Sequence, residues 1–211
     1  WGSSPWALKE VVEKTIKEKG GYDYPFIYSL EERKKELTPL LIDLNKITYD
    51  NDEKFMRLFV LVKKLQYEGH KILIFSERLA TAVYIEKGLQ DSISKTRIAN
   101  TVKQNGNEFA QKDFEEVHAL MIGFAPRSNS REDGVIPEDK YDIFITTDAY
   151  SEGVNLQDAS VVIHYDIAWT PDIIIQRVGR ILRFWPEPRM IHFYVFAGTY
   201  QQDTKRNKES L

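Results

Sequence analysis

The residues best suited to chemistry lie within one short stretch, QRVGRILR at 176–183. Gln176, Arg180 and Arg183 recur there at helical spacing, so one helix face would present an amide and two guanidinium groups. Gly179 beside them is a poor helix former, and its missing side chain would let a ligand approach closely. Guanidinium groups bind phosphate oxygens as a planar fork and stabilise the charge that develops during phosphoryl transfer. The stretch therefore favours a phosphate site, although arginines near the end of a helix can also simply complement its dipole.

The elements that precede this stretch would position it at the edge of a sheet. Two apolar runs, IFIT and VVIHY, have the length and the β-branched and aromatic composition of buried strands. Thr170 as a cap, Pro171 in the first turn and Asp172 at the positive end of the dipole predict a helix that begins at Pro171. Strand, loop, strand, loop and helix in this order predict parallel strands, and open α/β sheets bind their ligands at the carboxyl ends of such strands.

Patterns elsewhere in the chain supply the rest of an α/β domain. Apolar periodicity and turn signals predict a helix at 52–67, a strand at 71–76, a helix at 78–89 and a last strand at 190–196. Periodicity is weak over 91–110, where we expect one short strand and an exposed loop. The pattern over 108–120 is helical.

The first fifty residues predict helices. A serine before Pro5 marks the start of an amphipathic helix. Ser29 and Glu32 have the spacing of a capping box, which predicts the start of a second helix. We expect that helix to end or restart at Thr38-Pro39, because a proline disfavours helical backbone at the residue before it. Residues 1–50 therefore read as a helical appendage.

Composition limits the classes of protein to which the chain can belong. Its 211 residues are 42% hydrophobic, which allows a substantial core, and no apolar run approaches the length that spans a bilayer. The net charge of −3 means that any contact with nucleic acid must be a local patch. The chain has no cysteine, which excludes disulfides and thiolate metal sites, and we predict no metal bound by its own residues. It has no signal peptide, so the cytoplasm is the default location. Its first residue is Trp1, so we expect a fragment of a longer protein.

Read together, three ordered motifs resemble those of superfamily 2 helicases and translocases. TTDAYSEGVNLQDA, followed by VVIHYD and QRVGRILR, looks like motifs V and VI, and KILIFSERLATAVYIEKGL is similar to motif IV and its helix. SEGVNLQDA, FAPRSN and SSPWAL resemble bacterial Swi/Snf-related ATPases. The resemblance implies an α/β fold, with a RecA-like parallel sheet flanked by helices. It also implies three parts: a helical appendage at 1–50 that links to a missing first lobe, the C-terminal RecA-like domain at 51–200, and a charged tail at 201–211.

The resemblance assigns five residues to the nucleotide. Arg180 and Arg183 match the arginine fingers that reach the γ-phosphate held by the first lobe. Gln176 matches the polar residue that senses this phosphate and the catalytic water. Gly153 and Asn155 match the turn that approaches the sugar, where many relatives carry aspartate in place of Asn155.

Three hydroxyl residues are expected to face the nucleic acid. Thr146 and Thr147 match hydroxyls that touch the nucleic-acid backbone and position it without reading its sequence. Ser76 lies at the end of the 71–76 strand, an edge that faces the nucleic-acid track in the family, although a serine there is more often a helix cap. Arg177 is left with a structural or coupling role.

The sequence lacks one half of an ATPase site. It has no G-x-x-x-x-G-K-[ST] loop and no Asp-Glu motif for magnesium, so ATP and Mg²⁺ would be held mainly by the missing lobe. We therefore expect the second lobe of an ATP-dependent helicase or translocase that acts on nucleic acid, with DNA favoured over RNA, and that is inactive as an isolated fragment. The alternatives are a non-catalytic binding or scaffold module with the same fold, and an RNA helicase lobe.

Overall fold

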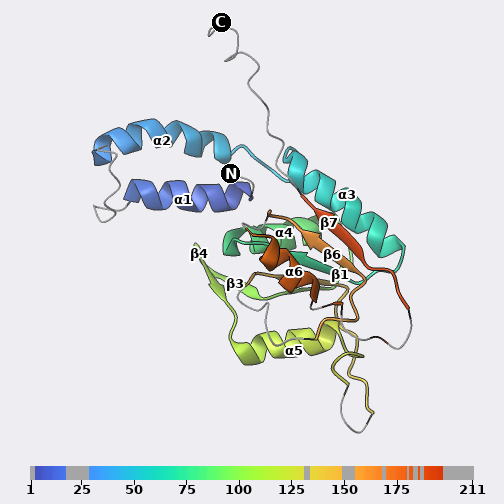
Figure 1. The fold of residues 1–211 in the computed structure, drawn as a ribbon. Helices are drawn as coiled ribbons and strands as arrows, with labels where there is room; N and C mark the ends of the chain where they lie inside the picture. The colour runs from blue at the N-terminus through green and yellow to red at the C-terminus, as the bar shows by residue number, and fades with distance from the viewer. Residues whose placement is uncertain are drawn as a thin grey trace, which may run out of the picture.

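A parallel five-stranded sheet forms the centre of the computed structural model (Figure 1). The structure describes residues 3–17, 29–130, 134–148, 155–167, 170–179, 181–182, 185 and 188–196. The strand order is β2-β5-β1-β6-β7, and the bounds are β1 Ile72–Phe75, β2 Ile98–Asn100, β5 Ile143–Thr146, β6 Val161–His164 and β7 His192–Val195. Every neighbouring pair in this sheet is parallel, so all five carboxyl ends meet at one edge. The predicted fold class and the strands at 143–146 and 161–165 are confirmed.

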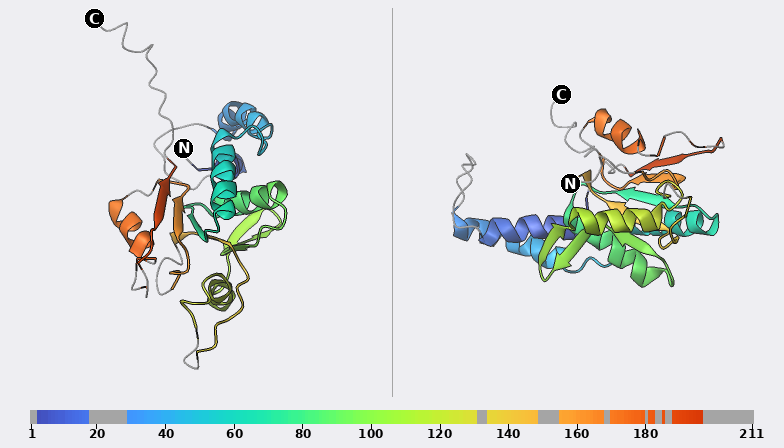
Figure 2. Two further views of the ribbon diagram at one scale, coloured as in Figure 1. Left: turned by 90° about the vertical axis from the view of Figure 1, so that its right-hand side faces the viewer. Right: turned by 90° about the horizontal axis from the view of Figure 1, so that it is seen from below.

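Helices cover both faces of the sheet, because its strands carry apolar side chains on both sides. One face packs on α3, Glu53–Tyr67, and α4, Leu79–Ser92, in a core that includes Phe55, Leu58 and Ile85. The other face packs on α5, Phe114–Phe124, through Val117, Met121 and Phe124. Figure 2 shows α6, Pro171–Gly179, on the side of the sheet opposite to α3. The helix start predicted at Pro171 is confirmed.

The N-terminal region is helical, as predicted. It contains α1, Pro5–Lys17, and α2, Leu30–Leu44, which lie side by side (Figure 1). The α1 helix also packs on α4, and the Trp6 and Tyr84 rings lie 5.6 Å apart between their centroids. Ser4 caps α1, since its Oγ accepts a hydrogen bond from Ala7 N at 3.2 Å. The first helix is therefore part of the packed structure.

The prediction that the second helix ends or restarts at Thr38-Pro39 is wrong. The α2 helix begins at the predicted capping box of Ser29 and Glu32 and continues through Pro39 to Leu44. Pro39 removes only its own backbone N–H from the helix, and Thr38 Oγ1 donates to Lys34 O at 2.6 Å on the same turn.

The prediction for 91–120 is only partly right. After β2 the chain forms an antiparallel hairpin of β3, Val102–Asn105, and β4, Glu108–Gln111. Asn105 pairs with Glu108 around a two-residue loop, and Gly106 in that loop has φ of 61°, which glycine adopts without strain. The expected helix at 108–120 begins only at Phe114, after a capping box of Asp113 and Glu116. The Gly-Asn pair within the weakly periodic stretch was the overlooked hairpin signal.

The described residues contain neither a helix that could span a membrane nor a cluster that could hold a metal ion. No helix among them is long and apolar enough to cross a bilayer. The same residues contain no group of three or more histidine, cysteine, aspartate or glutamate side chains arranged to hold a metal ion.

Candidate functional site

The polar residues predicted from the motifs gather at the carboxyl edge of the sheet. Thr146 ends β5 and Thr147 follows it, while Ser76 follows β1 and Asp166 lies just beyond β6. These three strands are neighbours in the order β5-β1-β6, so their carboxyl ends place the four residues along one edge. The sheet thus unites residues that are far apart in the sequence.

Ser76 is buried and bound to Asp166. Its Oγ donates to Asp166 Oδ2 at 2.9 Å, and Glu77 N donates to the same oxygen at 3.1 Å. Lys54 Nζ of α3 donates to Asp166 Oδ1 at 3.3 Å. Burial lowers the pKa of Lys54, and the neighbouring Asp166 carboxylate opposes that shift. The Ser76 hydroxyl therefore serves a buried carboxylate in this structure, and its contact with nucleic acid stays a prediction.

The same carboxylate holds the start of the chain. Ser3 Oγ donates to Asp166 Oδ2 at 3.2 Å, and Ser4 Oγ lies 2.8 Å from Thr81 Oγ1 of α4. The SSPWAL motif therefore joins α1 to the carboxyl edge of the sheet.

Thr146 and Thr147 are also covered, with exposed fractions of 1% and 3%. Thr101 Oγ1 donates to Thr146 Oγ1 at 3.4 Å, and Thr146 Oγ1 donates to the Thr147 carbonyl at 3.1 Å. Gln111 Nε2, at the end of β4, donates a short hydrogen bond to Thr147 Oγ1. The Thr147 hydroxyl is therefore engaged by Gln111 in this structure, and no sequence motif pointed to Gln111.

Arg177 is the largest fully buried side chain among the described residues, at 0% exposed. Its Nε and Nη2 donate to Asp148 Oδ1 and Oδ2, each at 2.7 Å, which is a bidentate ion pair. Its Nη1 lies 2.8 Å from His164 Nδ1, and its guanidinium carbon lies 5.0 Å from the centre of the Phe75 ring. One side chain therefore fixes α6 to the ends of β5 and β6, and this gives Arg177 the structural role expected for it.

His164 is neutral at this contact. Burial and, to a smaller extent, the adjacent Arg177 charge lower its pKa to about 4, while the Asp148 carboxylate opposes the shift. Because the guanidinium donates to Nδ1, the ring proton is on Nε2, which is buried and has no hydrogen-bond partner within the described part of the chain. A neutral imidazole accepts from Arg177 without adding a second positive charge.

The α6 helix leads to the arginine pair. It is described as far as Gly179, and beyond it Ile181 N and Leu182 N both donate to Val178 O, at 2.9 and 3.0 Å. The Ile181 side chain is fully buried, whereas Leu182 is 62% exposed. A β-carbon at Gly179 would meet nothing within 4 Å, so close approach of this chain's own atoms does not require that glycine. Gln176 is exposed on α6, and Arg180 and Arg183 lie outside the described residues.

The loop that contains Asn155 is held by the FAPRSN segment at 124–129. Asp158 accepts hydrogen bonds from Arg127 N at 2.9 Å and Ser128 N at 2.8 Å. Asn129 Nδ2 donates to Asn155 O at 2.9 Å and also to Ala125 O at 2.8 Å. This clamp, which follows α5, fixes the backbone of Asn155. Gly153 lies outside the described residues.

Comparison with known proteins shows which family the chain resembles. Residues 129–184 match the helicase conserved C-terminal domain. An uncharacterized ATP-dependent helicase, YqhH, of Bacillus subtilis (strain 168) is 31% identical over 159 residues, which are 75% of this chain and 24% of that protein. The RNA polymerase-associated protein RapA of Vibrio parahaemolyticus is 26% identical over 144 residues, which are 68% of this chain and 13% of that protein.

A solved structure has the same fold. The C-terminal part of the Fun30 ATPase domain superposes on it with a TM-score of 0.53 at 17% identity. The match covers 92% of this chain and 64% of the Fun30 chain. This chain spans a quarter or less of the length of the two curated relatives, so the activity of a whole protein is a separate question.

Proposed function

Because the chain contains the C-terminal, RecA-like lobe of a superfamily 2 helicase or translocase related to Swi/Snf ATPases, we propose that it works as the second motor lobe of a longer ATP-driven protein. In this role it moves on nucleic acid and completes an ATP site whose other half belongs to a first lobe. The observation that carries the proposal is the bidentate Arg177–Asp148 pair, with both distances at 2.7 Å. This pair holds α6, which contains the start of the QRVGRILR motif, against Asp148, the residue after Thr147.

The arginine pair supplies the chemistry in this proposal. Arg180 and Arg183 stabilise charge on the γ-phosphate, and Gln176, exposed on α6, senses that phosphate and the attacking water. Asn155, whose backbone is fixed by Asn129, approaches the sugar together with Gly153. ATP and Mg²⁺ are held mainly by the first lobe, and bound Mg²⁺ would neutralise charge on the phosphates.

The nucleic acid is proposed to be DNA. The resemblance of the SEGVNLQDA, FAPRSN and SSPWAL segments to bacterial Swi/Snf-related ATPases supports this assignment. An RNA helicase lobe and a non-catalytic scaffold with this fold are the alternatives. A non-catalytic scaffold would have little reason to keep Gln176, Arg180 and Arg183 together, and this favours the motor.

Steady-state ATP hydrolysis by the full-length protein tests the proposal. Duplex DNA, single-stranded DNA and RNA of matched length are compared as activators at equal salt, because phosphate contacts depend strongly on salt. Stimulation by DNA above RNA supports a DNA motor, and stimulation by RNA alone identifies the RNA helicase. Absence of hydrolysis with every nucleic acid would leave the scaffold.

The isolated 211-residue chain is expected to show no nucleic-acid-stimulated ATPase and to bind ATP weakly, because its sequence lacks the loop that cradles the phosphates. Hydrolysis and an ATP titration of the purified chain measure this, with the full-length protein as the positive control. Robust turnover by the isolated chain would contradict the division of the ATP site between two lobes.

Thr147→Ala is expected to weaken binding of the full-length protein about two- to tenfold, because one hydrogen bond to the nucleic-acid backbone is lost. The loss should be similar for unrelated sequences, since phosphate contacts carry no sequence information. Fluorescence anisotropy with several oligonucleotides measures it.

Thr147→Ser is the matched control, because it keeps the hydroxyl that Gln111 Nε2 contacts. It should bind like the wild type. A loss confined to one oligonucleotide sequence, or an equal loss in both variants, would remove Thr147 from its backbone-binding role.

A further inference from the structure

Arg189 links two segments that the sequence motifs treat separately. Its Nη1 donates to Ala159 O at 3.2 Å and makes a shorter hydrogen bond to Gln157 O. Its Nη2 donates to Ile181 O at 2.9 Å. One guanidinium therefore holds three backbone carbonyls. Two belong to the loop after Asn155, and the third belongs to the turn after α6.

The position of Ile181 gives this link its significance. Ile181 directly follows Arg180 in the chain, and Arg183 comes two residues later. The Ile181 side chain is 0% exposed and packs in the core cluster that contains Leu156 and Ala159. The backbone between the two arginines is thus fixed by the buried side chain of Ile181 and by the hydrogen bond from Arg189 to the Ile181 carbonyl.

The loop at the other end of the link is itself rigidly held. Asp158 accepts hydrogen bonds from Arg127 N and Ser128 N at 2.9 and 2.8 Å, and both of its neighbours offer their carbonyls to Arg189. Arg189 therefore connects the turn after α6 to a loop that is held in place by its own hydrogen bonds to the 124–129 segment. Movement of that turn would break hydrogen bonds rather than carry the loop along.

The chemistry of the link requires an arginine. A planar guanidinium presents several N–H donors in fixed directions, whereas a lysine ammonium is a compact point charge on a flexible stem. The guanidinium carbon of Arg189 lies 4.4 Å from the centre of the Trp185 ring, which orients the plane. Burial lowers the pKa of Arg189, and the Asp158 carboxylate opposes the shift.

We propose that Arg189 is a positioning residue for ATP hydrolysis: by joining the Gln157 and Ala159 carbonyls to the Ile181 carbonyl, it fixes the turn that presents Arg180 and Arg183 to the γ-phosphate. The inference rests on the proposed function, since it concerns the same two arginines. It adds a residue outside every motif that the sequence pointed to, and it couples the sugar-binding loop to the arginine pair.

The test uses full-length protein with Arg189→Gln and Arg189→Lys. Small misplacement of a catalytic group costs on the order of 10²-fold in rate, so kcat for hydrolysis should fall at least about tenfold in both variants. ATP affinity should stay within about twofold, because arginines that act in the transition state contribute little to ground-state binding. Thermal unfolding shows that each variant is folded, and Arg189→Lys, which keeps the charge, serves if Arg189→Gln does not fold.

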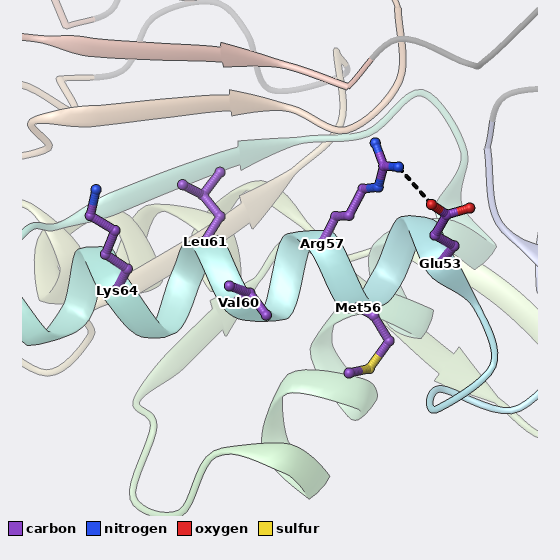
Figure 3. Close-up of a pocket in the computed structure, with 6 residues that line it drawn as sticks. All are labelled: Glu53, Met56, Arg57, Val60, Leu61 and Lys64. Atoms are coloured by element: carbon purple, nitrogen blue, oxygen red, sulfur yellow. Dashed lines mark hydrogen bonds and ion pairs between the residues drawn. The ribbon is translucent and has the colours of Figure 1, made fainter.

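Arg57→Gln is the matched control. Arg57 Nη2 lies 2.6 Å from Glu53 Oε1 on an exposed groove of α3 that is also lined by Met56, Val60, Leu61 and Lys64 (Figure 3). This helix covers the face of the sheet opposite to α6, so removal of its guanidinium should leave kcat unchanged (Figure 2).

A combined variant distinguishes positioning from general support of the fold. In single-turnover reactions, Arg189→Gln added to Arg180→Ala/Arg183→Ala should cause no further loss of rate, because Arg189 acts through the two arginines that are already absent. If Arg189→Gln lowers the rate again by its full factor, the role is merely structural and the inference is wrong. Normal kcat in Arg189→Gln, with collapse in Arg180→Ala, also overturns it and leaves the proposed function intact. Normal kcat in Arg180→Ala overturns the proposed function itself.

Discussion

Arg180→Ala in the full-length protein is expected to lower nucleic-acid-stimulated ATP hydrolysis by about 10³-fold or more, because an arginine finger acts mainly on the charge of the transition state. ATP binding should remain close to that of the wild type. Steady-state hydrolysis at saturating nucleic acid, together with a nucleotide-binding titration, measures both quantities. Arg183→Ala should show the same division between turnover and binding.

Arg180→Lys sharpens this expectation. A lysine offers a point charge where the phosphate oxygens meet a planar fork, so the substitution should fail nearly as badly as alanine. If the arginines only complement the dipole of an exposed helix end, either change would alter stability by a few tenths of a kcal/mol and leave turnover near normal. Near-normal turnover in a folded Arg180→Ala protein would therefore remove the arginine pair from the catalytic site.

Arg177→Ala is expected to lower the free energy of unfolding by about 2–3 kcal/mol. Removal of one partner from a buried ion pair costs about 3–5 kcal/mol, and this estimate is reduced because the Asp148 side chain is 40% exposed and can be solvated. The substitution also leaves a cavity beside Phe75 and deprives His164 Nδ1 of its donor. Urea unfolding of the 211-residue chain, followed by circular dichroism, measures the change.

Two further variants separate the causes of that loss. Asp148→Asn keeps the shape of the partner but not its charge, and it should cost less than Arg177→Ala because the buried guanidinium keeps its contact with His164. Arg57→Ala removes an exposed ion pair and should change stability by less than about 1 kcal/mol. Equal losses in Arg177→Ala and Arg57→Ala would show that the buried pair does not hold α6.

The sequence alone was sufficient for the elements that local patterns encode. The β-branched runs gave the strands β1, β5 and β6, and the capping signals placed the starts of α2 and α6 at the observed residues. These features depend on neighbouring residues, whose preferences act over a turn of helix or a few strand positions. Local signals also mislead, since Pro39 does not end α2, and the weak periodicity over 91–110 predicts one short strand and a loop where the chain forms the hairpin at 102–111.

The motifs likewise placed the candidate site at the carboxyl edge of a parallel sheet, and the family comparison supports the same lobe. They could not show what surrounds each motif residue. Ser76, Thr146 and Thr147 were expected to face nucleic acid, yet their hydroxyls are covered in this structure, by contacts that include Asp166, Thr101 and Gln111. Burial depends on which distant segments pack over a strand end, and periodicity carries no information about that.

The tertiary structure alone decided how the site is held together. Arg177 meets Asp148 and His164 because β5 and β6 end at the same edge of the parallel sheet. Arg189, which precedes β7, meets the carbonyls of Gln157 and Ala159, which precede β6, and of Ile181, because β6 and β7 are parallel neighbours. A buried guanidinium must find acceptors, but the sequence does not say which of them will lie within reach. The chain thus encodes the chemistry of its motifs locally, while the non-local hydrogen bonds that position them emerge only when the sheet is assembled.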